Sequence, residues 1–509
     1  MHAEAGAVPA ESFELRPEQT RSGHPALAQA ARFLRQQPGK ILAGSGLLLL
    51  PCFWHARIMA GDLASHTYNA WLVQLIHSGQ APGLYLARQW NNVLFDWMLS
   101  GLGGLFGLRA AEKICVSVCV LVFFWGAFAL LAAATRRAAW GIAPCLAMLA
   151  YGWTFQMGFF NYYLSLGLAF WALALFWRGS LRERLLALAL APLIWLAQPL
   201  GMAFLLGAAA CVAIAEMLKD YRQFLLLPAG TIVVLLVRAY LSRHYSVEAD
   251  PASFELLNGT DQFILFGERY LLLARAFFWF AAACLAVDLA TNFREHGLWR
   301  RYALPAQLYA LSVLAALFLP SVIRLPLYAI PISLITERLT ALCGVLSCVL
   351  LATLRPRLWH RAGFALAAAV FFALLYQDTA VLNRMEEQAE RLVAPLPPAQ
   401  RVLSTILPPP ESRVVIHHMV DRACIGRCYS YVNYEPSSRA FRVRALEGNP
   451  IVETDPEEVE NMQTGLYEVK LEDVPAYQIY QCSPAMTELC IRKLVPGELN
   501  GRIGVQPAR

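Results

Sequence analysis

Residues 93–108 read VLFDWMLSGLGGLFGL, and the path of this one apolar run decides how the rest of the chain is organised. The run falls short of the roughly 20 apolar residues that carry a helix across a bilayer. It contains Asp96, and the polar stretch 89–92 (QWNN) precedes it. Because charged groups are costly at the centre of a bilayer, these residues favour a helix that lies along a membrane surface.

The composition of the whole chain is that of a membrane protein. Of its 509 residues, 58% are hydrophobic and 15% are charged, and the mean hydropathy is +0.46. Soluble proteins carry about 25% charged residues, so this deficit indicates burial in lipid. The net charge of +6 is modest, and such an excess usually lies in cytoplasmic loops. The sequence contains no nucleic-acid-binding motif, so the bilayer and not nucleic acid is the expected partner.

Eleven apolar runs have roughly the length needed to cross a bilayer as helices. Together they predict an all-α polytopic membrane domain over residues 41–378. The predicted spans are 41–59, 112–134, 138–156, 162–177, 184–198, 200–217, 223–241, 269–290, 303–320, 337–354 and 362–378.

The charges between the spans give the chain its orientation. If 93–108 does not cross, every second connection faces the same side, and each of these connections is rich in Arg or Lys. They are Arg136-Arg137, Arg178 to Arg184, Lys219 to Arg222, Arg294 to Arg301 and Arg355 to Arg361. Positive charges collect in cytoplasmic loops, so this side is predicted to be the cytoplasm. The 93–108 run then becomes an interfacial helix in a large first external loop, roughly residues 60–111.

The two ends of the chain are predicted to lie on opposite sides of the membrane. Residues 1–40 are polar and end in basic residues, which predicts a disordered cytoplasmic tail followed by an uncleaved first span. Eleven crossings place the C-terminal region outside the cytoplasm. No retention signal ends the chain, and the expected location is the bacterial inner membrane.

The composition changes after Asp378. Prolines cluster at 395–398 and 408–410. Such clusters break helices, so residues 379–411 are predicted to form a proline-rich linker.

Residues 412–509 are predicted to form a small soluble α+β domain with strands at 413–417 and 467–471. All cysteines of this region lie on the predicted external side, where an even number indicates disulfides. They are Cys424, Cys428, Cys482 and Cys490.

Cys424 and Cys428 are close enough in sequence to bridge each other. They also lie near His417, His418 and Asp421, so a zinc site is the alternative. The spacing matches neither two cysteine pairs nor a cysteine pair with a histidine pair, and the disulfide is favoured.

Asp62 follows the first span in the segment Gly61-Asp62-Leu63-Ala64-Ser65-His66, next to water. The simplest role for Asp62 is to cap the helix that follows, because Asp is a good N-cap residue. The alternative is a functional carboxylate, and His66 lies one helical turn further on. His66 itself is either a solvated interface residue or a partner of Asp62.

A second unusual stretch lies at 319–332, which reads LPSVIRLPLYAIPI. Arg324 falls on the predicted external side, against the trend of the other basic residues. A lone Arg at an interface can reach toward lipid headgroups. It is also suited to hold a phosphate through charge-assisted hydrogen bonds, and Tyr328 adds a donor four residues later.

Together these elements resemble the GT-C class of membrane glycosyltransferases, notably the dolichyl-phosphate-mannose protein mannosyltransferases and the aminoarabinose transferase that modifies lipid A. In that class the first external loop opens with Gly-Asp and a helix, and an interfacial helix and a span ending in arginines follow. Gly61-Asp62, residues 93–108 and Arg136-Arg137 repeat this order. A late external loop of the class carries a basic residue, Pro, Tyr and Pro, as do Arg324, Pro326, Tyr328 and Pro331. The resemblance covers about residues 40–380.

The resemblance implies an inverting transfer of a sugar from a polyprenyl phosphate to a lipid, glycan or protein acceptor. Asp62 would be the general base that takes the acceptor's proton. His66 would orient Asp62 or contact the acceptor. Arg324, with Tyr328, would stabilise the leaving phosphate, and Arg88 is a weaker candidate for the same task.

The chain departs from the class in two places. Many members carry a second acidic residue in the next external loop, where this sequence has Asn161. Asn can bind or position a substrate but is a poor metal ligand, which argues against a divalent metal, and no other cofactor is implied. The Lys-Pro-Pro segment of the class has no clear copy near 88–93.

Two other functions compete with glycosyl transfer. A transporter or lipid flippase would usually show internal repeats and ionisable residues in mid-span, and neither is evident in the sequence. A non-catalytic membrane subunit with an external interaction domain would leave the segments around Asp62 and Arg324 without a role.

Overall fold

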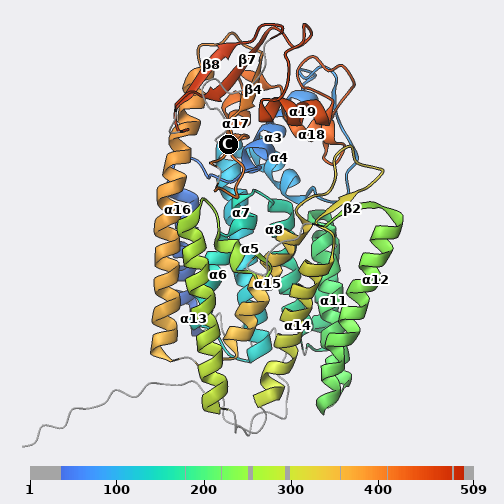
Figure 1. Cartoon of the computed structure of the whole chain (residues 1–509), viewed down its shortest axis with the longest axis vertical. Helices are drawn as coiled ribbons and strands as arrows, with labels where there is room; N and C mark the ends of the chain where they lie inside the picture. Colours follow the sequence, from blue (N-terminus) through green and yellow to red (C-terminus); the bar gives the residue numbers. More distant parts are fainter. Residues whose placement is uncertain are drawn as a thin grey trace, which may run out of the picture.

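The computed structural model describes residues 36–177, 179–218, 220–249, 256–292, 298–355, 357–409, 411–483 and 486–497. The predicted tail lies outside the described residues up to position 35, as do parts of several predicted basic loops. Figure 1 shows long helices with roughly aligned axes below and a smaller, strand-containing region at the upper end.

Seven helices are long and apolar enough to cross a membrane, so the chain is a multi-pass membrane protein. Each coincides with a predicted span. They are α5 (Leu108–Thr135), α11 (Pro199–Met217), α12 (Leu226–His244), α13 (Glu268–Asn292), α14 (Leu298–Phe318), α15 (Ile335–Ala352) and α16 (Leu358–Val393).

The other four predicted spans correspond to helices that are shorter or interrupted. They are α2 (Pro38–Phe53), the group η2 (Trp140–Ile142), α6 (Ala143–Ala150) and α7 (Trp153–Gln156), then α8 (Phe160–Phe176), and the pair α9 (Leu181–Ala189) and α10 (Ala191–Ala197). Proline explains the last interruption, since Pro192 lies in the first turn of α10 and Pro199 begins α11. Proline has no N–H to continue a helix but fits its first turn.

The basic connections meet at one end of the helices. Arg137 donates from Nη2 to the carbonyl of Ala352 at 2.6 Å. The backbone N–H of Arg355 donates to Asp288 at 3.2 Å. The first contact joins the 136–137 loop to the end of α15, and the second joins the start of the 355–361 loop to the end of α13, so these two predicted cytoplasmic loops lie at the same end of the helices.

The first loop lies at the opposite end and contains α3 (Leu63–His77), β1 (Leu84–Leu86) and α4 (Leu94–Phe106). Figure 1 shows α3 and α4 directly below the C-terminal strands. The apolar run 93–108 thus forms a separate helix of 13 residues, followed by Gly107 at a positive φ of 78°. A second pair of strands, β2 (Ser246–Glu248) and β3 (Val322–Arg324), joins two further loops, and η5 (Thr260–Phe263) lies between α12 and α13.

The C-terminal region is a mixed α/β unit. Its four-stranded sheet has the order β5-β4-β7-β8, with β4 parallel to both neighbours and β7 antiparallel to β8. The elements are β4 (Gln400–Thr405), α17 (Met419–Cys424), β5 (Cys428–Ser430), α18 (Tyr434–Ser438), β6 (Val443–Ala445), α19 (Pro456–Thr464), β7 (Ala476–Gln481) and β8 (Leu489–Lys493).

The disulfide prediction is confirmed, because Cys424 is bonded to Cys428 and Cys482 to Cys490. The two predicted strands are wrong, since 413–417 forms turns and irregular backbone and 467–471 contains only one isolated bridge position. Their alternating side chains pack instead as buried loop residues, among them Val414 and Val469.

The predicted linker is largely structured. Helix α16 continues through Asp378 without a break for 36 residues in all and ends at Val393, just before the first prolines. Strand β4 also lies inside the 379–411 range. The C-terminal region is therefore attached by a continuous helix.

The C-terminal region is built into the first loop and does not stand apart from it. Strand β6 pairs antiparallel with β1, so that Tyr85 lies opposite Arg444. The backbone N–H of Ala87 also donates to the carbonyl of Arg442 at 2.8 Å. The two segments share a hydrophobic core in which Tyr68 and Leu72 of α3 meet Val420 of α17.

Candidate functional site

The backbone of Asp62 is fixed at the start of α3. The N–H of Gly61 donates to the carbonyl of Gln156 at 2.6 Å, and the N–H of Asp62 donates to Met157 at 2.9 Å. Gly158 has a positive φ of 82°, and a Cβ there would lie 2.5 Å from the Asp62 nitrogen. Only glycine fits such a contact, so the turn between α7 and α8 positions this carboxylate.

The side chain of Asp62 does not cap its helix. Asp62 is the N-cap residue of α3, but its carboxylate makes no capping hydrogen bond, although this is the usual role of Asp at such a position. Its Oδ1 lies 3.6 Å from Nε2 of His418 instead, and 16% of the side chain is exposed. The carboxylate is therefore left for another role.

His418 reaches Asp62 from the C-terminal region, one residue before α17. Its Nδ1 lies 3.0 Å from Oδ2 of Asp421, and its Nε2 lies 2.9 Å from Nε2 of His417. Ser430 Oγ donates to Oδ1 of Asp421 at 2.5 Å. Burial lowers the pKa of His418 to about 4, against the attraction of Asp62. The imidazole is therefore neutral at physiological pH.

His66 is buried on α3 and faces two acids. Its Nδ1 lies 2.8 Å from Oδ1 of Asp96 and 3.4 Å from Oε1 of Glu435. Burial opposes a charge on the ring, but Asp96 first and then Glu435 outweigh it and raise the pKa of His66 to about 9. His66 is therefore a cation at neutral pH, one turn from Asp62, and not the solvated interface residue of the alternative interpretation.

Asn161 joins the site through Asp96. Its Nδ2 donates to Oδ2 of Asp96 at 2.9 Å, and its Oδ1 accepts from the backbone N–H of Phe95 at 2.8 Å. Both polar atoms of the amide are engaged, so Asn161 orients the acid that holds His66.

Glu435 and two aromatic rings close the site from the C-terminal side. Burial raises the pKa of Glu435, and His66 opposes this shift. The Tyr434 ring lies 5.0 Å from the His418 ring and 5.3 Å from the Phe441 ring, measured between centroids. These rings exclude water from the ionisable groups and so strengthen their interactions.

Arg338 adds a cation whose hydrogen-bonding capacity is only partly used. Its guanidinium lies over the Phe159 ring, 4.2 Å from the centroid, and its Nε is buried without a hydrogen-bond partner. The carboxylate of Asp62 is the strongest charge that attracts it. The first turn of α15 thus supplies a positive charge that Asp62 attracts and that keeps a free donor at Nε.

Arg324 and Arg88 lie in more open surroundings. Arg324 ends β3, and its Nη2 is 3.2 Å from Oε1 of Glu248, with 58% of each side chain exposed. Arg88 is exposed two residues after β1. The structure therefore associates Arg338 with Asp62 more closely than the arginines that the sequence indicated.

Tyr328 is half-buried on the loop between β3 and α15. The next residue, Ala329, donates from its backbone N–H to the carbonyl of Ser438 at 2.9 Å. Ser438 ends α18, the helix that carries Glu435. The loop with the Arg-x-Pro-x-Tyr stretch thus packs against the C-terminal wall of the site.

A second buried cluster lies beside the first and is centred on Arg422 of α17. Its Nη1 donates to Glu112 at 2.6 Å, and its Nε and Nη2 donate to Glu386 at 2.6 and 2.9 Å. Nη2 also donates to the carbonyl of Ile58 at 3.1 Å. Arg57 lies 3.5 Å from Glu386. This network ties the C-terminal region to α5, α16 and the start of the first loop.

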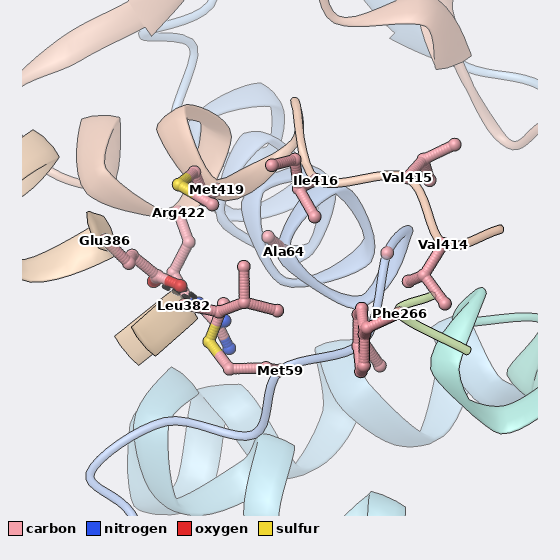
Figure 2. Close-up of a pocket in the computed structure, with 12 residues that line it drawn as sticks. Met59, Ala64, Phe266, Leu382, Glu386, Val414, Val415, Ile416, Met419 and Arg422 are labelled. Atoms are coloured by element: carbon pink, nitrogen blue, oxygen red, sulfur yellow. Dashed lines mark hydrogen bonds and ion pairs between the residues drawn. The ribbon is translucent and has the colours of Figure 1, made fainter. Parts of the chain in front are cut away.

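A small, mainly apolar cavity lies next to Gly61 and is bordered by the Arg422 cluster. Figure 2 shows side chains from the first loop, α16 and the segment before α17 converging on it, with the Glu386–Arg422 pair at its edge. Its apolar lining includes Met59, Ala64, Phe266, Leu382, Val415 and Met419.

The zinc alternative is wrong for Cys424 and Cys428, because they are bonded to each other and cannot act as thiolate ligands. Within the described ranges, no group of three His, Cys, Asp or Glu side chains is arranged to hold a metal ion.

No protein-family model, no curated protein and no solved structure matches this chain. The functional interpretation therefore depends on the geometry of these side chains and on the resemblance of the two sequence segments.

Four residues of the site were not selected from the sequence. They are Asp96, Arg338, His418 and Glu435. Two of them carried a usable signal, because Asp96 is the lone charge in an apolar run and Arg338 is a basic residue at the start of an apolar helix. Glu435 lies in a helix of five residues with no pattern that distinguishes it.

Proposed function

We propose that this protein is an inverting glycosyltransferase that moves a sugar from a polyprenyl-phosphate donor to an acceptor outside the cytoplasm. Asp62 acts as the general base and takes the proton of the acceptor hydroxyl or amine as that atom attacks the anomeric carbon. The observation that carries the proposal is the position of Asp62. It makes no capping bond, is partly open to solvent and attracts the Arg338 guanidinium electrostatically.

The cations near Asp62 suit a phosphate leaving group. The phosphate gains charge as the glycosidic bond breaks, and a fixed guanidinium in a dry site stabilises that charge. Arg338 has a free buried donor for this purpose, and Tyr328 lies on the adjoining loop. Arg324 and Arg88 are exposed and would meet the phosphate while the donor enters from the membrane surface.

His66 and Asn161 organise the site. The cationic His66 interacts with Asp96, Glu435 and Asp62 and limits the repulsion among these acids. Asn161 fixes Asp96 and thereby His66. The acceptor is a lipid, a glycan or a protein, and the sugar is not specified by these residues.

The predicted topology belongs to the same proposal. Eleven crossings with the N-terminus in the cytoplasm place the first loop and the C-terminal region outside a bacterial inner membrane. The clustering of basic loops at the other end and the two disulfides support this orientation.

The test is sugar transfer in membranes that contain the full-length protein. Polyprenyl-phosphate-linked mannose, glucose and aminoarabinose, each radiolabelled, are supplied as donors to wild type and to Asp62→Asn. The substitution keeps the size of the side chain but removes the base, so transfer should fall at least about 100-fold.

The matched control is Asp378→Asn. Asp378 pairs with Arg269 and Tyr270 on α13 and lies outside the site, so this variant should retain transfer. Equal transfer by wild type and Asp62→Asn would remove Asp62 from the mechanism. No transfer of any sugar by the wild type would contradict the proposed function and favour a transporter or a non-catalytic subunit.

A further inference from the structure

We propose that Arg442 and Arg444, on the open face of strand β6, form a subsite that binds a phosphate group of the acceptor. The inference rests on the proposed function, because it names a chemical class for the acceptor that Asp62 would activate. The subsite is a second position for an anion, in addition to the one that Arg338 offers to the leaving phosphate of the donor. The acceptor is then a phosphate-bearing molecule with a reactive hydroxyl or amine.

The pairing of β1 with β6 gives this small sheet one buried and one open face. Val443 lies in the hydrophobic core, whereas Tyr85, which is opposite Arg444, is exposed. The pairing continues for one more position, because the N–H of Ala87 donates to the carbonyl of Arg442 at 2.8 Å. Residues two apart on a strand share a face. Arg442 and Arg444 therefore lie on the open face together with the Tyr85 phenol, which is a further hydrogen-bond donor.

Neither guanidinium has an acidic partner. Within the described ranges, the Arg442 side chain makes no hydrogen bond or ion pair, and that of Arg444 donates from Nε to the carbonyl of Phe441 at 3.3 Å. Glu447, the nearest acid along the chain, forms no ion pair with either arginine in this part of the structure. Like charges on one face of a strand pair repel each other, so a bound anion would relieve the repulsion between the two arginines.

Arg442 is the arginine that gains most from a bound anion. Its side chain is half-buried, and burial lowers its pKa, although the attraction of Asp96 opposes the shift. The Asp96 oxygens are already engaged by His66 and Asn161. A partly buried charge without a partner is unfavourable. A phosphate would supply the partner through charge-assisted, bidentate hydrogen bonds.

The subsite borders the wall of the candidate site. The ring of Phe441, the residue before Arg442, lies 6.5 Å from the His66 ring between centroids. The side chains of Asp62 and Asp96 are each 16% exposed, so both are open to a bound molecule. The cationic His66 offsets the negative charge that Asp96 would present to a phosphate. An acceptor held at Arg442 would leave the rest of its length free to extend toward Asp62.

Direct binding tests the subsite without the need for sugar transfer. Purified full-length protein in an uncharged detergent is titrated calorimetrically with dioctanoyl phosphatidic acid and with glycerol phosphate. Each probe is compared with its uncharged counterpart, dioctanoylglycerol or glycerol. We expect the wild type to bind at least one phosphorylated probe, and Arg442→Gln and Arg444→Gln each to weaken this binding about tenfold. Binding of phosphatidic acid alone would assign a lipid headgroup, whereas binding of both probes would show that the phosphate suffices.

The matched control is Arg391→Gln. It removes an exposed arginine at the end of α16, whose Nε donates to the carbonyl of Glu387 in the same helix, and it should bind the probes as the wild type does. Thermal unfolding reports whether each variant is folded, and Arg444→Gln alone decides if Arg442→Gln is not. No binding, equal binding of charged and uncharged probes, or wild-type affinity in the folded variants would overturn the inference.

The charge of the transfer product gives a second test. Membranes with the wild-type protein are supplied with radiolabelled donor, and mild acid then removes the unreacted donor. Any amino group of the sugar is acetylated, so that the charge of the product is that of the acceptor. The labelled product should be retained on an anion-exchange resin, and a neutral product would overturn the inference but leave the proposed function standing. Wild-type inactivity would contradict the proposed function itself, and the binding experiment would still decide whether the subsite exists.

Discussion

The two buried polar clusters that join the C-terminal region to the first loop differ in how completely they are bonded. Around Arg422, three guanidinium nitrogens donate to two carboxylates and one carbonyl at 2.6–3.1 Å. Around Asp62, the contacts to His418 and from His66 to Glu435 are 3.6 and 3.4 Å, and Arg338 keeps an unpartnered Nε. Both clusters involve α17 or the residue before it. Only the cluster around Arg422 has its hydrogen bonds complete.

This difference distinguishes a cluster suited to a structural role from the candidate site of the proposed reaction. The attraction between buried charges offsets their desolvation only when their geometry is good and their hydrogen bonds are complete. Although burial works against charge, Glu112 and Glu386 raise the pKa of Arg422 above its ordinary value, so this ion group remains locked at every physiological pH. In the Asp62 cluster the pKa of His66 is raised and the pKa of His418 is lowered. Such perturbed pKa values are typical of functional sites.

Breaking the saturated cluster should have the largest effect on stability. Arg422→Ala leaves Glu112 and Glu386 buried without their main partner, so we expect a loss of about 3–5 kcal/mol in the free energy of unfolding. Thermal unfolding of the protein in detergent and the rate of proteolysis in the 394–413 segment would report it.

Arg427→Ala is the control for this prediction. The Arg427 side chain is exposed and donates to the carbonyl of Ala394 at 3.3 Å, so its removal should change stability by about 0.5 kcal/mol or less. Similar unfolding of wild type and Arg422→Ala would mean that the saturated cluster does not hold the C-terminal region.

The value of kcat/KM for the sugar donor should fall more when Arg338 is replaced than when the exposed Arg324 is replaced. Arg338→Gln removes the charge beside Asp62, and we expect kcat/KM for the donor to fall roughly thirtyfold, equivalent to about 2 kcal/mol. Arg324→Gln should cost about threefold or less, because its exposed guanidinium is shared with Glu248. Transfer assays over a range of donor concentrations measure both, and the opposite ranking would restore Arg324 as the main phosphate ligand.

The pH dependence of stability should reveal the charge on His66. Its pKa is about 9 in the folded protein against an ordinary value of 6.5. A raised pKa contributes stability that is complete below about 6.5 and disappears as the pH rises through about 9. We expect this contribution to be on the order of 3 kcal/mol and to be absent in His66→Gln. Thermal unfolding between pH 6 and pH 10 measures the difference.

His77→Gln provides the comparison on the same helix, since His77 is exposed at the end of α3. Its stability should follow the wild-type pH profile. A constant offset between wild type and His66→Gln across this range would show that His66 contributes no charge.

The sequence predicted the long helices and the cysteine pairs because both depend on local patterns. A run of about 20 apolar residues predicts a membrane-spanning helix wherever it lies in the chain. Shorter crossings were less predictable, since α6 and α7 are separated at Gly152, where a Cβ would meet the carbonyl of Gln262 at 2.8 Å. That contact joins residues more than a hundred positions apart and leaves no trace in a local pattern.

The sequence indicated the site residues of the first loops, but not those that the C-terminal region adds. Asp62, His66 and Asn161 were selected from loop positions, and the structure connects the last two through Asp96. His418 was noticed for its neighbouring cysteines, which suggested zinc, and its approach to Asp62 depends on how α17 packs against α3. A tertiary contact of this kind follows from the docking of two domains and not from either segment alone.

Helix α16 physically links the membrane-spanning part of the chain to the C-terminal region beside the candidate site. Its 36 residues, at 1.5 Å each, make a rod of roughly 54 Å, whereas the hydrocarbon core of a bilayer is about 30 Å thick. The predicted span 362–378 accounts for about half of this length, and the turns beyond it carry Arg384, Glu386 and Glu387, which belong outside the hydrocarbon core. The upper end of this rod holds Arg422 through Glu386, and α17 follows His418 directly. The upper half of α16 is therefore a stiff extension of the membrane anchor, and it holds α17, together with His418, at a fixed distance from the bilayer.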